Sequence, residues 1–157
     1  MDGGSLYRIV AVSDIHHDVE RLQRLLPIIN SATCFVCCGD GVSDVMYVRG
    51  GITVPIVCVN GNNDRGFNLS EIATTVFGST RAMIVHGHKF DVRNGLKLLY
   101  VTALHQKCEL VFYGHTHMFS DKTVQGVHFI NPGALCNGSY ALVAGDGTNF
   151  VCKQGTI

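Results

Sequence analysis

Histidines occur in pairs where apolar runs of this sequence end. His115-Thr116-His117 follows the run 110–113 after one glycine, and His86-Gly87-His88 directly follows the run 83–85. Imidazole nitrogens held close together on a tight loop commonly bind a metal ion. Six of the eight histidines lie in loops of this kind, namely His16, His17, His86, His88, His115 and His117. This concentration of histidine predicts a functional centre.

Carboxylates and amides follow three further apolar runs. They are Asp14 after 9–12, Asp40 after 34–38, and Asn62 with Asp64 after 56–59. Counted with the histidine loops, five strand ends would deliver oxygen and nitrogen atoms to one edge of the fold.

The elements that must position these loops alternate through the first part of the chain. Strands are expected at 6–13, 33–38, 54–59, 80–85 and 110–113. Helices are expected at 18–29 with Asp18 as the N-cap, at 94–106, and more weakly at 43–49. Strand, helix, strand with continuously apolar strands predicts a right-handed crossover and a parallel sheet covered on both faces.

The last third of the chain has a different pattern. Segments 123–130, 140–144 and 149–153 are short apolar stretches joined by glycine turns, which is typical of antiparallel hairpins. Together the two parts predict an α/β fold of two stacked sheets flanked by helices. At 157 residues with 46% hydrophobic content, the chain 1–157 is expected to form one domain.

Composition limits the classes of partner. Twelve basic residues balance twelve acidic ones, so no overall field would recruit nucleic acid or an anionic membrane. The sequence shows neither a signal-peptide pattern nor a membrane-spanning stretch, and we expect a soluble, cytoplasmic protein. The seven cysteines favour free thiols in a reducing compartment. Cys34 and Cys37 would point to opposite faces of one strand, which favours core packing over a shared metal.

The order of the motifs carries a family resemblance. The motifs are Asp14-x-His16, Gly39-Asp40, Gly61-Asn62-x-Asp64, His86-Gly87-His88, Gly114-His115-x-His117 and Asn131-Pro132-Gly133. In this order and at strand ends, they resemble the calcineurin-like metallophosphoesterases, specifically the small YfcE-like phosphodiesterase branch. The resemblance extends from Ile9 to Gly133, which is most of the chain, and it implies a four-layer α-β-β-α sandwich of two mixed sheets.

The resemblance also implies a site with two divalent metal ions. Asp14, His16, Asp40 and His117 would hold one ion, and Asn62, His86, His115 and the shared Asp40 would hold the other. A carboxylate suits the bridging position, and mixed nitrogen and oxygen ligands without thiolate suit Mn, Ni, Co, Fe or Zn better than Ca or Mg. Manganese is the expected metal.

The implied reaction is in-line attack on phosphorus by a hydroxide that bridges the two metals. Catalytic roles are expected for Asp40, Asn62, Asn63 and His88. Asn63 stands where many members of the superfamily have a histidine that can protonate the leaving oxygen, although the YfcE-like branch also lacks that histidine. Because asparagine does not titrate, we expect the enzyme to favour leaving groups that are stable as anions.

Two other functions compete with a phosphodiesterase. A phosphomonoesterase could use the same site, and a non-catalytic scaffold could use the same fold, as in the retromer subunit that has lost part of the ligand set. Retention of all the ligand positions favours an enzyme. The expected partner is a small phosphate ester, with no membrane and no large nucleic acid, because segments 41–51 and 66–78 show no base-stacking or basic pattern. Homo-oligomer formation stays open.

Several residues have a structural interpretation beside the functional one. His88 would orient the ligands or be a plain loop residue, and Asp64 would either orient a ligand or cap a turn. His17 is expected at a helix start. Residues expected to be structural or exposed are His105, His128, Arg65 and Lys89.

Overall fold

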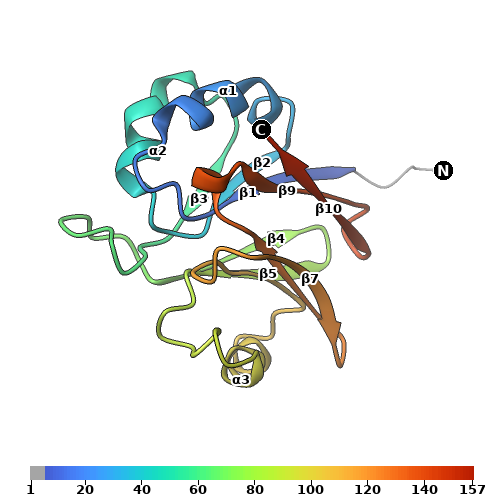
Figure 1. Ribbon diagram of the computed structural model, residues 1–157. Helices are drawn as coiled ribbons and strands as arrows, with labels where there is room; N and C mark the ends of the chain where they lie inside the picture. The colour runs from blue at the N-terminus through green and yellow to red at the C-terminus, as the bar shows by residue number, and fades with distance from the viewer. Residues whose placement is uncertain (1–5) are drawn as a thin grey trace.

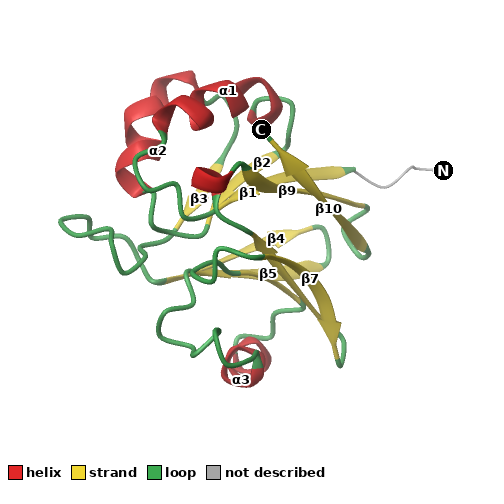
Figure 2. Ribbon diagram, viewed as in Figure 1, coloured by secondary structure: helices red, strands yellow, loops and turns green. Residues whose placement is uncertain are grey.

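Two five-stranded sheets face each other, with helices on their outer faces (Figures 1 and 2). The computed structural model describes residues 6–157. The strands are β1 (Tyr7–Val12), β2 (Cys34–Cys37), β3 (Ile56–Cys58), β4 (Ile72–Phe77), β5 (Thr80–Val85), β6 (Leu110–Phe112), β7 (Phe119–Val124), β8 (Val127–Pro132), β9 (Ser139–Gly145) and β10 (Phe150–Thr156). The helices are α1 (Val19–Ile29), α2 (Val42–Val48) and α3 (Lys97–His105), with short 3-10 turns η1 (Arg49–Gly51) and η2 (Leu135–Asn137).

Both sheets are mixed. The first has the order β10-β9-β1-β2-β3, in which β1, β2 and β3 run parallel and the β9–β10 hairpin joins antiparallel to β1. The second has the order β4-β5-β6-β8-β7, in which β5, β6 and β8 run parallel. The parallel strands of each sheet bring their carboxyl ends to one edge, as the sequence predicts.

Three apolar layers separate the four layers of secondary structure. One lies between the sheets and includes Phe112 and Ile130. A second lies between the first sheet and helices α1 and α2, and a third between the second sheet and α3. The predicted α-β-β-α sandwich is therefore confirmed.

Helix α1 follows its sequence pattern closely. The Asp18 side chain accepts a hydrogen bond from the Arg21 N–H at 3.1 Å and so caps the first turn. Leu22, Leu25 and Ile29 recur at helical spacing and are fully buried against the first sheet.

Two parts of the second sheet differ from the prediction. Strand β4 lies in a segment that the sequence suggested only as a wall of the cleft, because two threonines, one of them exposed, interrupt the apolar residues of this edge strand. The expected segment 123–130 is two strands, since Gln125 and Gly126 both take positive φ and form the hairpin turn between β7 and β8.

Cys34 and Cys37 lie in the core as predicted. Cys34 packs between the two sheets, whereas Cys37 packs on the helix side of the first sheet. All seven cysteines are free thiols. Within residues 6–157, no helix has the length and apolar content needed to cross a membrane.

Candidate metal centre

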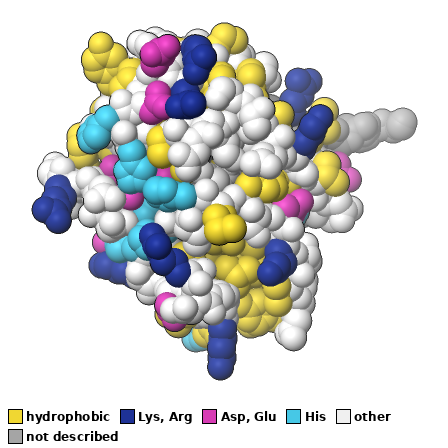
Figure 3. Space-filling model, in the orientation of Figure 1, with side chains coloured by type: hydrophobic (Ala, Val, Ile, Leu, Met, Phe, Trp, Pro, Cys, Tyr) yellow, Lys and Arg dark blue, Asp and Glu magenta, His cyan; other side chains and the backbone are white. Residues whose placement is uncertain are grey.

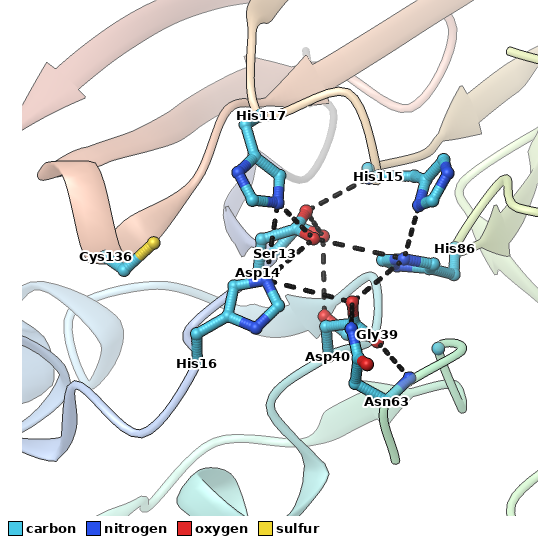
Figure 4. Close-up of polar contacts among 12 residues, drawn as sticks. Ser13, Asp14, His16, Gly39, Asp40, Asn63, His86, His115, His117 and Cys136 are labelled. Atoms are coloured by element: carbon cyan, nitrogen blue, oxygen red, sulfur yellow. Dashed lines mark hydrogen bonds and ion pairs between the residues drawn. The ribbon is translucent and has the colours of Figure 1, made fainter. Parts of the chain in front are cut away.

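Loops at four strand ends converge on one cluster of acidic and imidazole side chains (Figure 4). The loop after β1 carries Asp14 and His16, the loop after β2 carries Asp40, and His86 follows β5 directly. The loop after β6 carries His115 and His117. In the space-filling view, histidine side chains gather on one face of the molecule, with lysine and arginine nearby (Figure 3).

The backbone at this edge is strained. Five of the clustered residues have a left-handed backbone, with φ of 53° at Asp14, 47° at His16, 56° at Asp40, 73° at His115 and 63° at His117. Positive φ is uncommon outside glycine, and such outliers gather at functional sites. The loop after β6 approaches the loop after β1 so closely that position 114 requires glycine, because a Cβ on Gly114 would collide with Ser13 Oγ.

One half of the cluster surrounds Asp14. Its Oδ1 atom lies 3.2 Å from His117 Nε2 and 3.5 Å from His16 Nε2, and these two nitrogens are 3.3 Å apart. Oδ2 accepts hydrogen bonds from Ser13 Oγ and the His115 N–H. Oδ1 is buried and makes no hydrogen bond to any of the described residues. A buried carboxylate oxygen without a hydrogen bond, facing two imidazole nitrogens, fits a cation.

The other half joins Asp40, His86 and His115. His86 Nδ1 lies 2.8 Å from the Cys38 carbonyl oxygen, so it must be the donor. In a neutral ring, Nε2 then presents a lone pair, and it faces Asp40 Oδ2 at 3.3 Å and His115 Nδ1 at 3.3 Å. A lone pair facing a carboxylate oxygen is unfavourable unless a proton or a cation lies between the two atoms. A backbone carbonyl behind the imidazole is also the usual way to orient a metal-binding histidine.

The protonation of this half follows from the same contacts. Burial alone would raise the pKa of Asp40, but hydrogen bonds and charge from His86 and hydrogen bonds from Asn63 outweigh it and hold that pKa well below its usual range. Burial opposes the His86 imidazolium, yet the hydrogen bond with Asp40 and the charges of Asp14 and Asp40 raise its pKa. Both directions favour a carboxylate at Asp40 beside an imidazolium at His86, and a bound cation would take the place of the imidazolium proton.

Asp64 fixes the backbone that carries Asp40. Its buried carboxylate accepts hydrogen bonds from the N–H groups of Asp40 at 2.7 Å, Gly61 at 2.7 Å and Val42 at 3.0 Å. These bonds tie the loop after β3 to the loop after β2. Of the two roles that the sequence allows for Asp64, the structure therefore favours orienting a ligand loop.

The two asparagines of the β3 loop lie differently. The Asn63 backbone N–H donates to Asp40 Oδ1 at 2.9 Å, and the Asn63 amide nitrogen donates to Asp40 Oδ2 at 2.8 Å. Asn62 is exposed, and within residues 6–157 no side-chain hydrogen bond joins it to the cluster. The structure thus joins six of the seven predicted ligands by short contacts, and within residues 6–157 it shows no such contact for the amide of Asn62.

Comparison with known proteins identifies the family. A family model described as the calcineurin-like phosphoesterase superfamily domain matches residues 7–147. The chain belongs to the calcineurin-like phosphoesterase superfamily. The resemblance carried by the sequence motifs is therefore confirmed. Relatives in this family are named as metallophosphoesterases, which implies divalent metal ions, and the donor set around Asp14 and Asp40 fits them.

Relatives of this calcineurin-like phosphoesterase include bacterial and archaeal proteins. The probable metallophosphoesterase YsnB of Bacillus subtilis is 24% identical over 128 residues, covering 81% of this chain and 74% of the relative. The phosphodiesterase MJ0936 of Methanocaldococcus jannaschii is 26% identical over 146 residues, covering 82% of this chain and 84% of the relative.

Solved structures agree with the fold. A conserved uncharacterized protein of Streptococcus pneumoniae, a predicted phosphoesterase, superposes with a TM-score of 0.84 at 25% identity, covering 97% of this chain and 90% of that one. A single mutant of Vps29 from Entamoeba histolytica superposes with a TM-score of 0.76 at 18% identity, covering 96% of this chain and 99% of that one. At that identity the likeness to Vps29 shows the fold alone.

The remaining histidines fall into two groups. His88 lies beside the metal centre, with its ring centroid 5.4 Å from that of His86 and 6.3 Å from that of His115. His17 stands in the loop just before α1, with its side chain 89% exposed. His128 pairs with Asp121 at 2.6 Å, and His105 is exposed on α3.

Sequence reasoning missed two residues that touch the centre. Arg93 donates a hydrogen bond from Nη2 to the His115 carbonyl at 3.4 Å, which brings a positive charge to the rim. Burial and the charges of His86 and Arg93 lower the pKa of His115, which favours the neutral imidazole that a metal needs. Ser13 donates to Asp14 Oδ2 at 2.7 Å, and only its place next to Asp14 in the sequence could have indicated it.

Proposed function

We propose that this calcineurin-like phosphoesterase is a dinuclear metal-dependent phosphodiesterase that hydrolyses a small phosphate ester. The observation that carries the proposal is the buried Oδ1 atom of Asp14, which makes no hydrogen bond in the described part of the chain although imidazole nitrogens face it. The archaeal relative named as a phosphodiesterase supports the diester preference. Manganese is the metal we propose, with Ni, Co, Fe or Zn as substitutes, because nitrogen and oxygen ligands are mixed without thiolate.

The ligands divide between two ions. Asp14, His16 and His117 would hold one ion, and His86 with His115 would hold the other, with Asp40 between them. Asn62 completes the second set on the family resemblance alone. Bound divalent cations supply Lewis acidity and a water of lowered pKa for in-line attack on phosphorus.

The protein groups prepare this chemistry by orientation and charge. The Cys38 carbonyl fixes the tautomer of His86, and Asp64 fixes the backbone of Asp40. Arg93 adds positive charge at the rim of the centre, and this charge would attract the negatively charged phosphate group of a substrate. Asn63 cannot deliver a proton, and its amide nitrogen already donates to Asp40, so departure of the ester oxygen depends on its own stability as an anion.

The substrate class can be tested on the metal-loaded protein. After chelation and loading with manganese, we expect faster hydrolysis of bis(p-nitrophenyl) phosphate than of p-nitrophenyl phosphate. His117→Ala should remove the activity, whereas His105→Ala, an exposed histidine on α3, should retain it. Faster hydrolysis of the monoester would support a phosphomonoesterase instead, and no hydrolysis of either ester would support a non-catalytic scaffold.

We also propose a reducing, cytoplasmic location. Seven free cysteines, three of them in β2 and directly after it, support this proposal, because such thiols persist where disulfides are kept reduced.

A further inference from the structure

The short turn η2 supports the loop that carries Asp14. The Leu135 N–H donates to the Ser13 carbonyl at 2.9 Å, and the Cys136 N–H donates to the Asp14 carbonyl at 3.3 Å. Ser13 in turn donates its hydroxyl to Asp14 Oδ2. Because Asp14 has a positive φ, which is a strained backbone for a non-glycine residue, its conformation depends on such contacts. A shift of η2 would therefore displace Asp14.

One side chain of α1, Arg21, holds η2 in place. Its Nη1 atom donates to the Cys136 carbonyl at 3.0 Å and to Asp18 Oδ2 at 2.6 Å, and its Nε atom donates to the Ile157 carbonyl at 3.3 Å. Ile157 closes the link, because its N–H donates at 2.9 Å to the carbonyl of Gly138, the residue directly after η2. One guanidinium thus joins the start of α1, the turn η2 and the residue that follows β10.

These contacts exceed those of an ordinary ion pair on a helix surface. A surface pair three residues apart, such as Asp18 and Arg21, contributes little to stability. The two carbonyl contacts use separate nitrogens of one planar guanidinium, which the single nitrogen of a lysine does not offer. The Arg21 side chain is 33% exposed, so water competes with these bonds only in part.

From these contacts we infer that Arg21 is a positioning residue for the half of the metal centre that Asp14, His16 and His117 form, here called the Asp14 half. Arg21 acts through η2 on the backbone of the Asp14 loop, and within residues 6–157 its side chain makes no hydrogen bond to a predicted ligand side chain. The inference rests on the proposed dinuclear site. The other half, here called the His86 half, has no such link to η2, so its affinity for metal should not depend on Arg21.

The test measures each half of the centre by itself. His115→Ala removes a ligand from the His86 half, so the ion that this variant still binds reports on the Asp14 half, and His117→Ala does the converse. Calorimetric titration of chelated protein with manganese gives the Kd in each background, with and without Arg21→Ala. Groups that orient metal ligands typically contribute about 10- to 100-fold to metal affinity, so we expect Kd to rise about tenfold or more with His115→Ala and less than about twofold with His117→Ala.

Arg24→Ala is the matched control. Arg24 lies on the same helix, is exposed, and within residues 6–157 its side chain forms no hydrogen bond or ion pair. Its replacement should leave Kd unchanged in both backgrounds. An equal rise of Kd in the two backgrounds with Arg21→Ala would indicate a general loss of structure, and no rise in either would show that the Asp14 half does not need Arg21. Each of these results would overturn the inference.

Arg21→Lys provides a milder variant in case Arg21→Ala does not fold, which circular dichroism of the metal-free protein would show. Lysine keeps the positive charge beside Asp18 but offers one nitrogen in place of two. We expect the same selective rise of Kd at a smaller size. An unchanged Kd for Arg21→Lys in the His115→Ala background would contradict the role given to the two carbonyl contacts.

Titration of the native protein separates this inference from the proposed function. Two ions per chain, bound with affinities that Arg21→Ala does not change, would leave the dinuclear function standing and contradict the positioning role. One ion per chain, weakened by Arg21→Ala but not by Arg24→Ala, would contradict the dinuclear function and support the positioning role.

Discussion

At the scale of single residues, Asp40 stands between the two halves of the metal centre. Its Oδ2 atom lies 3.3 Å from His86 Nε2 and 3.8 Å from His16 Nε2. A carboxylate in this position can serve both ions, whereas each histidine can serve only one. The sequence identified Asp40 because it directly follows an apolar strand, but it could not show that both halves face this carboxylate.

Replacement of Asp40 should therefore damage both sites. Asp40→Asn keeps the shape but removes the charge, and we expect the metal content to fall from about two ions to less than about one per chain. Elemental analysis after identical reconstitution measures this content. Asn62→Ala is the control, and an equal loss of metal in the two variants would argue against a bridging role for Asp40.

Asn63 predicts a strong dependence on the leaving group. Because no titratable acid stands at this position, kcat/KM should fall steeply as the pKa of the leaving phenol rises. Asn63→His should flatten this dependence if the imidazole reaches the leaving oxygen. The measurement is kcat/KM over a series of substituted phenyl phosphodiesters at saturating metal and constant pH. A shallow slope in the native protein would show that another group already supplies the proton.

At the scale of the elements, the loops that follow β2 and β3 act as one unit. Asp64, from the β3 loop, accepts three backbone hydrogen bonds, one of them from Asp40 in the β2 loop and one from Val42, the first residue of α2. The order of Gly61, Asn62 and Asp64 indicated a site loop, but the three acceptor contacts depend on how the two loops pack. Sequence alone therefore left the role of Asp64 open.

Loss of this acceptor should loosen both loops. Asp64→Asn leaves at least one buried N–H group facing an amide nitrogen, and each unpaired group costs about 1–3 kcal/mol of stability. Urea unfolding of the metal-free protein measures the change. Asp121→Asn is the control, because Asp121 pairs with His128 near the surface and contributes about 0–1 kcal/mol. Equal midpoints for the two variants would contradict the role given to Asp64.

Helix α2 contains a carboxylate whose burial opposes its charge. Burial raises the pKa of Asp44, and the charge of Asp64 adds to the effect. Because the folded pKa lies above the unfolded value, the stability that the protonated carboxyl provides is lost as pH rises through the folded pKa. Asp44→Asn should therefore raise the melting temperature at pH 7, and the gain should shrink toward about pH 4.

Asp146 provides the control of opposite sign. Hydrogen bonds from the N–H groups of Asn149 and Thr148 lower its pKa, so its contribution is present above the unfolded pKa and is lost as pH falls. Asp146→Asn should lower the melting temperature at pH 7, with a smaller effect in acid. A gain from Asp44→Asn that does not change with pH would contradict the role of burial.

Some elements could be predicted better than others for a physical reason. Strand β5 was predicted with its observed bounds because it is a buried apolar run. Strand β4 was not, because an edge strand alternates exposed and half-buried residues and contributes little apolar pattern. The turn at Gln125 and Gly126 was missed because β7, the strand before it, is mostly polar and gives no apolar pattern of its own.

At the scale of the whole molecule, the metal centre depends on both sheets. Asp14, His16 and Asp40 come from the first sheet, whereas His86, His115 and His117 come from the second. The order of the motifs indicated this assembly through the family resemblance. The link from Arg21 to η2 could not be predicted, because it depends on packing between residues far apart in the sequence.

The central claim is that this calcineurin-like phosphoesterase needs two metal ions for its activity. The most direct test is to measure metal content and bis(p-nitrophenyl) phosphate hydrolysis together during stepwise reconstitution of chelated protein with manganese. We expect activity to rise toward a plateau at about two ions per chain, and to be lost on exhaustive chelation. Full activity after exhaustive chelation, or a plateau at about one ion, would contradict the account.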